Sequence, residues 1–312
     1  MLDVSNLTVH LPGQAGMVRI VDGVSFSVAA NSVLGIVGES GSGKSITCAA
    51  MLGLLPRGAR VDGSVRFMGR EILGLEEDAM RELSGSDIGY VFQDPMTSLN
   101  PTMTVGAQIV ETLRRHHNIP RRAAWDRAVE LLDKVGIAQP QRRAHDYPHE
   151  YSGGMRQRAM IAIAISCEPK LVIADEPTTA LDVTVQAQIL DLMLDMRERM
   201  GLSIVFISHD LSVIANVCDD VMVMYAGEVV ERANVDELFA APKHPYTRAL
   251  LAATQRFPGQ PLVTLEGTPP APGRWDAGCR FRDRCGVAAD ACSAHPLLTT
   301  HSSGLARCHF VP

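Results

Sequence analysis

The sequence predicts an α/β fold with a largely parallel sheet. Short apolar runs alternate with segments of helical periodicity, a pattern typical of strands joined by helices. Continuous apolar runs at 33–37, 171–174 and 204–207 indicate central strands that are buried on both faces. Between 183 and 200 apolar residues recur at helical spacing, and Gly201 is placed to end that helix.

Other segments predict the rest of the fold. Apolar and polar residues alternate at 24–28 and 65–67, which indicates half-buried strands. A helix is expected at 46–55. Between 100 and 160 no strand pattern occurs, which predicts a helical insert. After about residue 241 prolines become frequent and the helical period fades, so we expect 243–312 to form a separate, loop-rich extension.

Composition excludes several classes of protein. The chain has 312 residues, of which 46% are hydrophobic and 21% are charged, values that exclude disorder, collagen and coiled coil as the overall class. The net charge of −6 gives no basic footprint, so nucleic acid is not an expected partner. No apolar run reaches the roughly 18 residues of a membrane helix, and the start of the chain has no pattern of a secretory signal. We therefore expect a cytosolic protein with reduced cysteines.

A glycine-rich segment predicts phosphate binding. Residues 38–45, GESGSGKS, fit the pattern G-x-x-x-x-G-K-[ST] directly after the predicted strand 33–37. Its glycines let backbone N–H groups turn towards phosphate oxygens, and the following helix adds its partial positive charge. Lys44 is expected to reach the β- and γ-phosphates and Ser45 to ligate Mg²⁺. The expected ATP-binding residues are Gly38, Glu39, Ser40, Gly41, Ser42, Gly43, Lys44, Ser45, Ile46 and Thr47.

Two carboxylates follow the apolar run 171–174. Asp175, at the strand end, is suited to hold Mg²⁺, and Glu176 is suited to polarise a water towards the γ-phosphate. General base assistance of this kind contributes about 10²–10⁴ in rate. A strand that stops at polar residues is common by itself. Together with the glycine-rich loop, the pair predicts phosphoryl transfer, because that chemistry needs both a phosphate cradle and a metal carboxylate.

Four further motifs identify a resemblance. Residues 151–158, YSGGMRQR, resemble the signature motif of ABC ATPases, with Met155 where Gln is usual. Gln93 in FQDP resembles the Q-loop glutamine, Asp182 in ALD the D-loop aspartate, and His209 in SHD the switch histidine. Singly these three could be a polar loop residue, a helix cap and a buried hydrogen-bonded histidine. All motifs in the correct order resemble an ABC ATPase over about residues 1–240.

The resemblance implies a fold and domain boundaries. The expected fold is a P-loop NTPase of the ABC type, with a RecA-like core, an antiparallel β subdomain and a helical subdomain. The ATPase domain would cover 1–242, with the helical subdomain at about 94–160, and the cysteine-containing extension would cover 243–312. In this family an aromatic residue of the N-terminal strands normally stacks on adenine. Residues 11–21 contain no Phe, Tyr or Trp, so aliphatic contact is expected there instead, from Met17, Val18 or the stem of Arg19.

The resemblance also implies residue roles. The expected catalytic residues are Glu176 as general base, His209 as γ-phosphate sensor, Gln93 and Lys44, and the expected Mg²⁺ ligands are Ser45, Gln93 and Asp175. ABC domains work as pairs, in which the signature of one copy contacts the ATP held by the other. Ser152, Gly153, Gly154 and Met155 would contact that ATP, and Asp182 would act across the interface. Each motif occurs once here, so the chain needs a partner ATPase.

A narrower resemblance concerns the transporter branch. Residues 93–101, 147–155, 244–247 and 278–285 are similar to the oligopeptide/dipeptide importers. This implies an ATP-hydrolysing subunit, peripheral on the cytoplasmic face of the inner cell membrane, that couples hydrolysis to uptake of di- or oligopeptides. The implied partners are a second homologous ATPase in a heterodimer, two transmembrane permeases and, indirectly, a peptide-binding protein. The alternatives are a nickel or other small-solute importer of the same branch, and a soluble ABC ATPase with no transport role.

Four cysteines in the extension form a candidate metal site. Their spacing is C-x5-C-x6-C-x15-C. Disulfides are disfavoured in the cytosol, and a structural zinc site usually contains a shorter spacing. A [4Fe–4S] cluster takes four cysteine ligands, and the peptide branch is similar in this tail, so we favour the cluster over Zn²⁺ and Zn²⁺ over free thiols. The four are Cys279, Cys285, Cys292 and Cys308. The other three lie in apolar stretches and are expected in the core: Cys48, Cys167 and Cys218.

Overall fold

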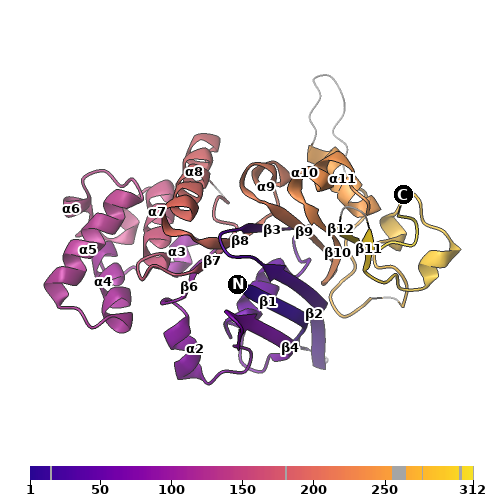
Figure 1. The fold of residues 1–312 in the computed structure, drawn as a ribbon, viewed down its shortest axis with the longest axis horizontal. Helices are drawn as coiled ribbons and strands as arrows, with labels where there is room; N and C mark the ends of the chain where they lie inside the picture. The colour runs from indigo at the N-terminus through magenta and orange to yellow at the C-terminus, as the bar shows by residue number, and fades with distance from the viewer. Residues whose placement is uncertain (15, 180, 255–264, 276, 302–303, 312) are drawn as a thin grey trace. The chain divides into compact units, whose positions relative to one another are not determined.

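The computed structural model describes residues 1–14, 16–179, 181–254, 265–275, 277–301 and 304–311. The chain divides into two compact units. Figure 1 labels the helices and strands along the chain. Unit 1 consists of residues 1–29, 33–74 and 206–312, and unit 2 of residues 30–32 and 75–205. The C-terminal extension therefore packs in the same unit as the N-terminal strands and the glycine-rich loop.

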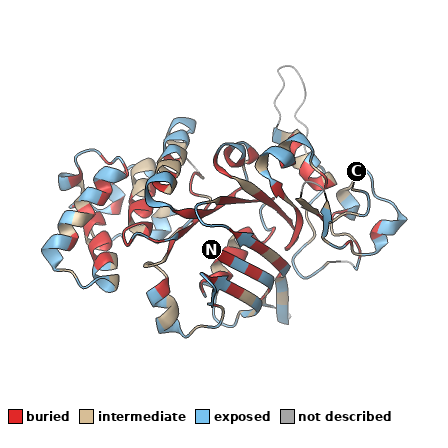
Figure 2. Cartoon of the chain, viewed as in Figure 1, coloured by how far each residue is buried: buried red, intermediate tan, exposed pale blue. Residues whose placement is uncertain are grey.

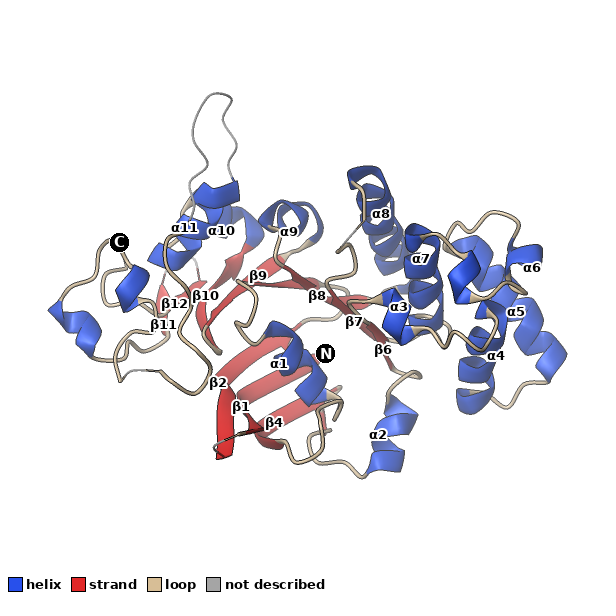
Figure 3. Ribbon diagram, turned by 180° about the vertical axis from the view of Figure 1, so that it is seen from behind, coloured by secondary structure: helices blue, strands red, loops and turns tan. Residues whose placement is uncertain are grey.

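Unit 1 contains an antiparallel sheet in the order β2-β1-β4-β5. Its strands are β1 (Leu2–Gly13), β2 (Gly16–Val28), β4 (Arg60–Phe67) and β5 (Arg70–Glu71). Val4 on β1 pairs with Phe26 on one side and with Val65 on the other, and all three side chains are buried. The alternation predicted at 24–28 and 65–67 is confirmed. Every second residue of these segments is buried, because alternate side chains of a strand point to the same face of the sheet. Figure 3 shows α1 (Lys44–Met51) over this sheet.

A second set of strands in unit 1 runs in the order β11-β12-β10-β9-β3. β3 (Val33–Val37) has the predicted bounds, is wholly buried, and pairs in parallel with β9 (Asp220–Tyr225). The remaining pairings are antiparallel. The other strands are β10 (Glu228–Asn234), β11 (Thr299–His301) and β12 (Gly304–Ala306). β12 is a strand that the sequence did not predict, and it joins the extension to the sheet by backbone hydrogen bonds with β10.

The helices of unit 1 differ from expectation in two places. α1 begins at Lys44, two residues earlier than predicted, and ends at Met51, because Gly53 adopts a positive φ of 66° that closes the last turn. α11 (Pro245–Thr254) is a ten-residue helix at the start of the extension, where loops were expected. The other helical segments are α9 (Leu211–Val217), α10 (Val235–Ala240) and the 3₁₀ turns η2 (Arg282–Arg284) and η3 (Asp290–Ser293).

Unit 2 combines a parallel strand pair with a helical insert. β6 (Ile88–Val91) and β7 (Leu171–Asp175) pair in parallel, and no strand lies between 100 and 160, as predicted. β8 (Ser203–Ser208) is buried throughout. Its first three residues belong to unit 2 and its last three to unit 1. The helices are α2 (Glu77–Leu83), α3 (Pro95–Ser98), α4 (Val105–His116), α5 (Arg121–Lys134), α6 (Pro140–Arg143), η1 (Pro148–Glu150), α7 (Gly153–Ala164) and α8 (Val183–Met200).

The core follows the pattern that the sequence predicts. Figure 2 shows buried residues on the strands and on the inner faces of the helices, with exposed residues on the outer helix faces. α8 has the predicted bounds, buries Ile189, Met193 and Met196, and ends at Gly201, whose φ is 64°. The three cysteines expected in the core, Cys48, Cys167 and Cys218, are buried.

Candidate active site

The glycine-rich loop connects β3 to α1 in unit 1. Gly38, Gly41 and Gly43 all have positive φ angles, of 153°, 79° and 99°. At Gly38 a Cβ atom would stand 2.2 Å from the carbonyl oxygen of Met224 and 2.8 Å from Ser42 Oγ. Only glycine fits this position, because both the backbone angle and the space exclude a side chain. The loop is thus held in a tight turn directly before the helix.

The polar groups of this loop suit a bound phosphate. Lys44 is 5% exposed, and its Nζ donates hydrogen bonds to the carbonyl oxygens of Gly38 (2.8 Å) and Glu39 (3.0 Å), so its cation is held at the loop. No side chain caps the amino end of α1, which leaves the positive end of the helix dipole facing the loop. Among the described residues, Ser42 Oγ is buried without a hydrogen-bond partner. Thr47 Oγ1 donates to the carbonyl of Gly43 (2.8 Å) and stabilises the first helical turn.

The two carboxylates at the end of β7 lie in unit 2. Asp175 is 6% exposed and accepts a hydrogen bond from Tyr90 Oη at 3.1 Å. Glu176 follows with a φ of 46°, a left-handed conformation that a residue with a side chain rarely adopts. Such strain persists only where the surrounding structure enforces it, and it is concentrated at functional sites. The strain turns the chain sharply at the end of the strand.

Gln93 and Glu176 come together in unit 2. Gln93 lies beyond the end of β6, and its Nε2 donates a 3.1 Å hydrogen bond to Glu176 Oε2. Thr179 Oγ1 donates to the same oxygen at 2.9 Å. Two donors on one oxygen fix the orientation of the carboxylate, as a general base requires. The structure thus brings two sequence-predicted residues into direct contact, and it adds Thr179, which sequence reasoning missed.

The signature segment forms the exposed amino end of α7. Ser152 is the N-cap, and its Oγ accepts a hydrogen bond from the backbone N–H of Met155. Ser152 and Gly153 are exposed, and Gly154 is half-buried against Val185, where a Cβ would stand 2.7 Å from Cγ1. An exposed helix amino end offers backbone N–H groups and a positive dipole to an anion.

The two remaining motif residues have different surroundings. Asp182 is the N-cap of α8, and its Oδ1 accepts a hydrogen bond from the N–H of Val185 at 2.9 Å. The interpretation of Asp182 as a helix cap is therefore confirmed. Ala180 of the same motif lies outside the described residues. His209 follows β8 in unit 1 and is exposed, so the reading as a buried histidine is wrong. Its neighbour Asp210 caps α9 through Ser212, which shapes the loop around His209.

All four cysteines of the extension line one small cavity in unit 1. The backbone N–H of Cys279 donates to the carbonyl of Cys292 at 2.9 Å, which draws two of the loops together. All seven cysteines lie among the described residues, and none of them forms a disulfide. Burial raises the pKa of the Cys279 thiol to about 11. Within the described part of the chain, no three His, Cys, Asp or Glu side chains are gathered closely enough to hold a single metal ion.

The extension contacts the glycine-rich loop through a pair that sequence reasoning missed. Arg284 donates two hydrogen bonds to the carboxylate of Glu39, at 2.6 and 2.9 Å. The backbone N–H of Glu39 donates to Tyr246 Oη at 2.9 Å. Glu39 lies in the glycine-rich loop and Arg284 lies between Cys279 and Cys285, so each stands in a motif recognised from the sequence. No pattern in the sequence connects the two. Nearby, His244 is buried, and burial lowers its pKa to about 3.

The strands expected near adenine gain a tryptophan neighbour from the extension. The Trp275 ring centroid lies 5.7 Å from Cζ of Arg19 on β2 and 3.7 Å from Cζ of Arg280. Gly227 approaches the same ring closely, because its Cβ would stand 2.7 Å from Trp275 Cη2. An aromatic ring of the extension thus lies beside Arg19, in a segment that itself contains no Phe, Tyr or Trp.

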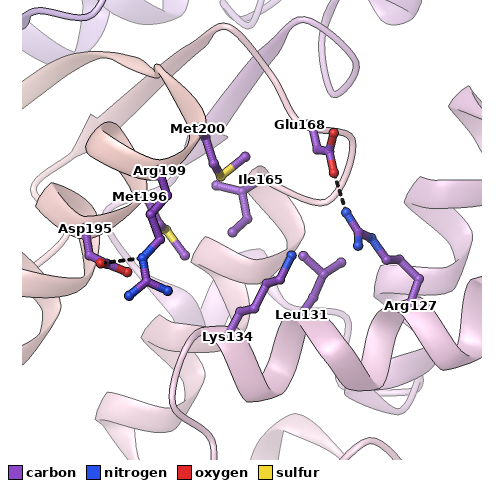
Figure 4. A pocket seen from close by; sticks show the side chains of 9 residues that line it. All are labelled: Arg127, Leu131, Lys134, Ile165, Glu168, Asp195, Met196, Arg199 and Met200. Atoms are coloured by element: carbon purple, nitrogen blue, oxygen red, sulfur yellow. Dashed lines mark hydrogen bonds and ion pairs between the residues drawn. The ribbon is translucent and has the colours of Figure 1, made fainter.

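A groove in unit 2 contains none of the predicted site residues. Figure 4 shows its lining, in which Arg127 pairs with Glu168 and Arg199 with Asp195. Apolar side chains of Leu131, Ile165, Met196 and Met200 line the rest. The paired charges leave no strong field of one sign, so the groove supports no functional assignment.

Comparisons with known proteins identify the family. The model of the ABC transporter family matches residues 21–179, and that of the oligopeptide/dipeptide transporter C-terminal region matches residues 230–292. The chain is 47% identical to the oligopeptide transport ATP-binding protein OppD of Escherichia coli, over all of this chain and 93% of that protein. It is 46% identical to the dipeptide transport ATP-binding protein DppD of Haemophilus influenzae, over 99% of this chain and 95% of that protein.

A solved structure agrees with the fold. The dimeric post-hydrolysis state of the ATP-binding cassette MJ0796, bound to ADP and Pi, matches 75% of this chain and 99% of that chain with a TM-score of 0.68 and 25% identity. The fold is therefore that of an ABC ATPase with an antiparallel β subdomain, as the sequence predicts, and a C-terminal extension follows it. No helix in the described part of the chain is both long and apolar enough to cross a membrane. The chain belongs to the ATP-binding proteins of the oligopeptide/dipeptide branch of the ABC transporters, the ATPases that drive peptide import.

Proposed function

We propose that this chain binds MgATP at its glycine-rich loop, hydrolyses it to ADP and phosphate, and thereby drives uptake of di- or oligopeptides through membrane permeases. The observation that carries the proposal is the contact between Gln93 and Glu176, a carboxylate oriented by two donors directly after a buried strand. The match of residues 230–292 to the peptide-transporter C-terminal region supports peptides as the cargo.

Each residue has a chemical role in this proposal. Lys44 holds the β- and γ-phosphates, because its buried cation already sits at the loop. Ser45, Gln93 and Asp175 provide oxygen ligands, the kind that Mg²⁺ prefers, and bound Mg²⁺ neutralises charge on the phosphates. Glu176 takes the proton of the attacking water. His209 follows β8 on an exposed loop and senses the γ-phosphate.

We further propose that the active form is a dimer of two cassettes, most simply this chain with a homologous one. The chain has one glycine-rich loop and one signature segment, and the signature helix presents an exposed amino end. Ser152, Gly153, Gly154 and Met155 contact the ATP of the partner, and Asp182 lies at the interface. Support comes from the cassette MJ0796, whose structure is dimeric. Two permeases and, indirectly, a peptide-binding protein complete the importer.

The proposed function also implies where in the cell the chain acts. The chain binds to permeases at the cytoplasmic face of the inner membrane as a peripheral subunit, which agrees with the lack of a membrane-spanning helix among the described residues. Two alternatives are less well supported. A nickel or other small-solute importer of the same branch would share the motifs, but the relatives compared above are named for oligopeptides and dipeptides. A soluble ABC ATPase would have no use for the transporter C-terminal region.

We propose that the four cysteines of the extension hold a [4Fe–4S] cluster. Four thiols line one cavity, as cluster ligation requires. Among the described residues no group of three or more His, Cys, Asp or Glu side chains could hold a single metal ion, so the set does not favour zinc. The cluster would supply a structural cross-link in a segment with few core residues. Iron and sulfide analysis with absorbance near 400 nm would support the cluster, and a colourless protein loaded with zinc would refute it. Cys285→Ser should lose the iron, whereas Cys167→Ser should keep it.

A lysine pair tests the nucleotide function. Lys44→Ala removes the cation at the loop and should weaken MgATP binding by at least about tenfold and abolish peptide uptake by the assembled transporter. Lys134→Ala, an exposed lysine in α5, is the matched control and should change neither quantity. Unchanged affinity and uptake in Lys44→Ala would overturn the proposed function.

A further inference from the structure

The glycine-rich loop contains an unfavourable charge for a site that binds triphosphate. Glu39 is the second residue of the loop, and its backbone carbonyl accepts a hydrogen bond from Lys44 Nζ at 3.0 Å. The carboxylate of Glu39 therefore belongs to the segment in which the phosphates of ATP are expected. A carboxylate at that position repels phosphates unless a cation neutralises it.

The extension provides that cation. Both outer nitrogens of Arg284 donate to the two carboxylate oxygens of Glu39, at 2.6 and 2.9 Å. A bidentate pair of this geometry is among the strongest charged contacts in proteins. The Arg284 side chain is 5% exposed and that of Glu39 is 27% exposed, so solvent reaches the pair only from the carboxylate side. The hydrogen bond with Glu39 raises the pKa of Arg284 above its ordinary value.

Arg284 is itself held rigidly. Its Nε donates to the carbonyl of Glu266 at 2.9 Å, and one outer nitrogen also donates to Tyr225 Oη at 3.2 Å. Beneath it, the rings of Tyr225, Tyr246 and Phe281 pack with centroids 4.6 to 5.4 Å apart. Tyr246 Oη accepts the N–H of Glu39, so one aromatic cluster fixes both the arginine and the loop backbone.

A second arginine of the same segment fixes a neighbouring hairpin. Arg280 donates to the carbonyl of Ala226 at 2.6 Å and pairs with Asp22. The next residue, Gly227, donates to the carbonyl of Ser42 in the loop at 3.0 Å. The segment between Cys279 and Cys285 thus contacts the loop directly through Arg284 and indirectly through Arg280. The extension is built against the nucleotide loop.

We propose that Arg284 is a positioning residue for nucleotide binding: it neutralises Glu39 and holds the loop in the conformation that binds the phosphates of ATP. The inference rests on the proposed role of the loop. It assigns a function to the extension that the ATPase motifs do not contain, because residues 280–284 set the affinity of a site more than 200 positions earlier in the chain.

The test measures the Kd of MgADP, which the protein cannot hydrolyse, with the full-length chain. Arg284→Ala should raise the Kd about tenfold, the effect of removing a charged hydrogen-bond pair. Arg282→Ala is the matched control, since it removes an exposed arginine side chain two positions away that has no hydrogen bond or ion pair among the described residues, and it leaves the backbone hydrogen bonds of that position in place. It should change the Kd by less than about twofold.

A rescue separates charge neutralisation from a loss of folding. Adding Glu39→Gln to Arg284→Ala removes the unpaired carboxylate and should return the Kd to within about threefold of its original value. In the assembled transporter, Arg284→Ala should raise the KM for ATP more than it lowers kcat. Should Arg284→Ala fail to fold, Arg284→Lys keeps the charge without the bidentate geometry and should raise the Kd about threefold.

Two results would overturn the inference. One is an Arg284→Ala chain, folded by circular dichroism, with the same Kd as Arg282→Ala. The other is an elevated Kd that Glu39→Gln does not lower. Lys44→Ala, measured in the same assay, separates the inference about Arg284 from the proposed role of the glycine-rich loop. If Lys44→Ala weakens MgADP binding and Arg284→Ala does not, only the inference fails, whereas unchanged binding in Lys44→Ala overturns the role of the loop itself.

Discussion

Gln93 donates a hydrogen bond to Glu176, a residue 83 positions further along the chain, and Thr179 donates to the same carboxylate oxygen. The contact joins two motifs: Gln93 is the second residue after β6, and Glu176 is the first residue after β7. The parallel pairing of β6 with β7 brings their carboxyl ends to one edge, which is why the two side chains meet.

Glu176→Gln should abolish turnover while leaving nucleotide binding intact. The amide keeps the shape of the side chain but cannot take a proton, and general base assistance is worth about 10²–10⁴ in rate. Steady-state ATPase measurements on the assembled transporter would show kcat lower by at least about 100-fold. Glu198→Gln, an exposed glutamate of α8, is the control. Near-normal hydrolysis in Glu176→Gln would exclude this residue as the base.

Gln93→Ala should lower kcat by about tenfold, since it removes one of the two donors that orient the Glu176 carboxylate. Thr179→Val removes the other donor with little change in volume and should have an effect in the same direction. The double variant with Glu176→Gln provides the decisive measurement. Because the orienting effect of both donors acts through Glu176, Gln93→Ala should cost less once Glu176 has been replaced, and the remaining cost would be that of the lost Mg²⁺ contact. Additive losses would show that Gln93 acts independently of Glu176.

Gly38→Ala should unfold the loop, because the new Cβ would stand 2.2 Å from the Met224 carbonyl. We expect a loss of about 2 kcal/mol or more in the free energy of unfolding, together with loss of MgATP binding. Gly41→Ala is the control, since its Cβ would meet no atom within 4 Å and only the positive φ is unfavourable. Its cost should be about 1 kcal/mol. Urea titrations of the three proteins would rank them, and equal stabilities would contradict the steric argument.

His244 should make the protein less stable in acid. Its pKa is about 3 in the folded chain, against an ordinary value of 6.5, because burial disfavours the imidazolium. Below pH 6.5 the unfolded chain therefore takes up a proton that the folded chain does not. The contribution is complete above pH 6.5 and is lost as the pH falls from 6.5 towards 3, by about 1.4 kcal/mol per pH unit.

His244→Asn tests this linkage. The asparagine oxygen can accept the N–H of Tyr246 as His244 Nδ1 does, at 3.0 Å, but it does not titrate. Urea titrations at pH 7.5 and 5.5 should show a smaller drop in stability for the variant than for the original chain. An identical pH dependence in both proteins would place the acid sensitivity elsewhere.

Residues close in the chain were the ones that the sequence could predict. The bounds of β3 and α8 followed from apolar periodicity, and the cap at Gly201 followed from a residue type that tolerates positive φ. The nucleotide motifs could be recognised because each is a short local pattern whose residue types are dictated by phosphate chemistry. The assignments of the individual site residues stay predictions for the experiments above.

Residues far apart in the chain were not predictable in this way. No local pattern reveals that Arg284 pairs with Glu39, or that Trp275 lies beside Arg19, because each contact depends on how the extension folds back. β12 is three residues long and is a strand because it pairs with β11 on one side and with the edge of β10 on the other.

By itself, the sequence determined the α/β class, the nucleotide motifs and the transporter branch, because short-range patterns encode strands, helices and phosphate contacts. Only the tertiary structure decided that the cysteine segment is built against the glycine-rich loop. The physical reason is that a charge pair and an aromatic cluster form between segments whose separation along the chain carries no information about their distance in space.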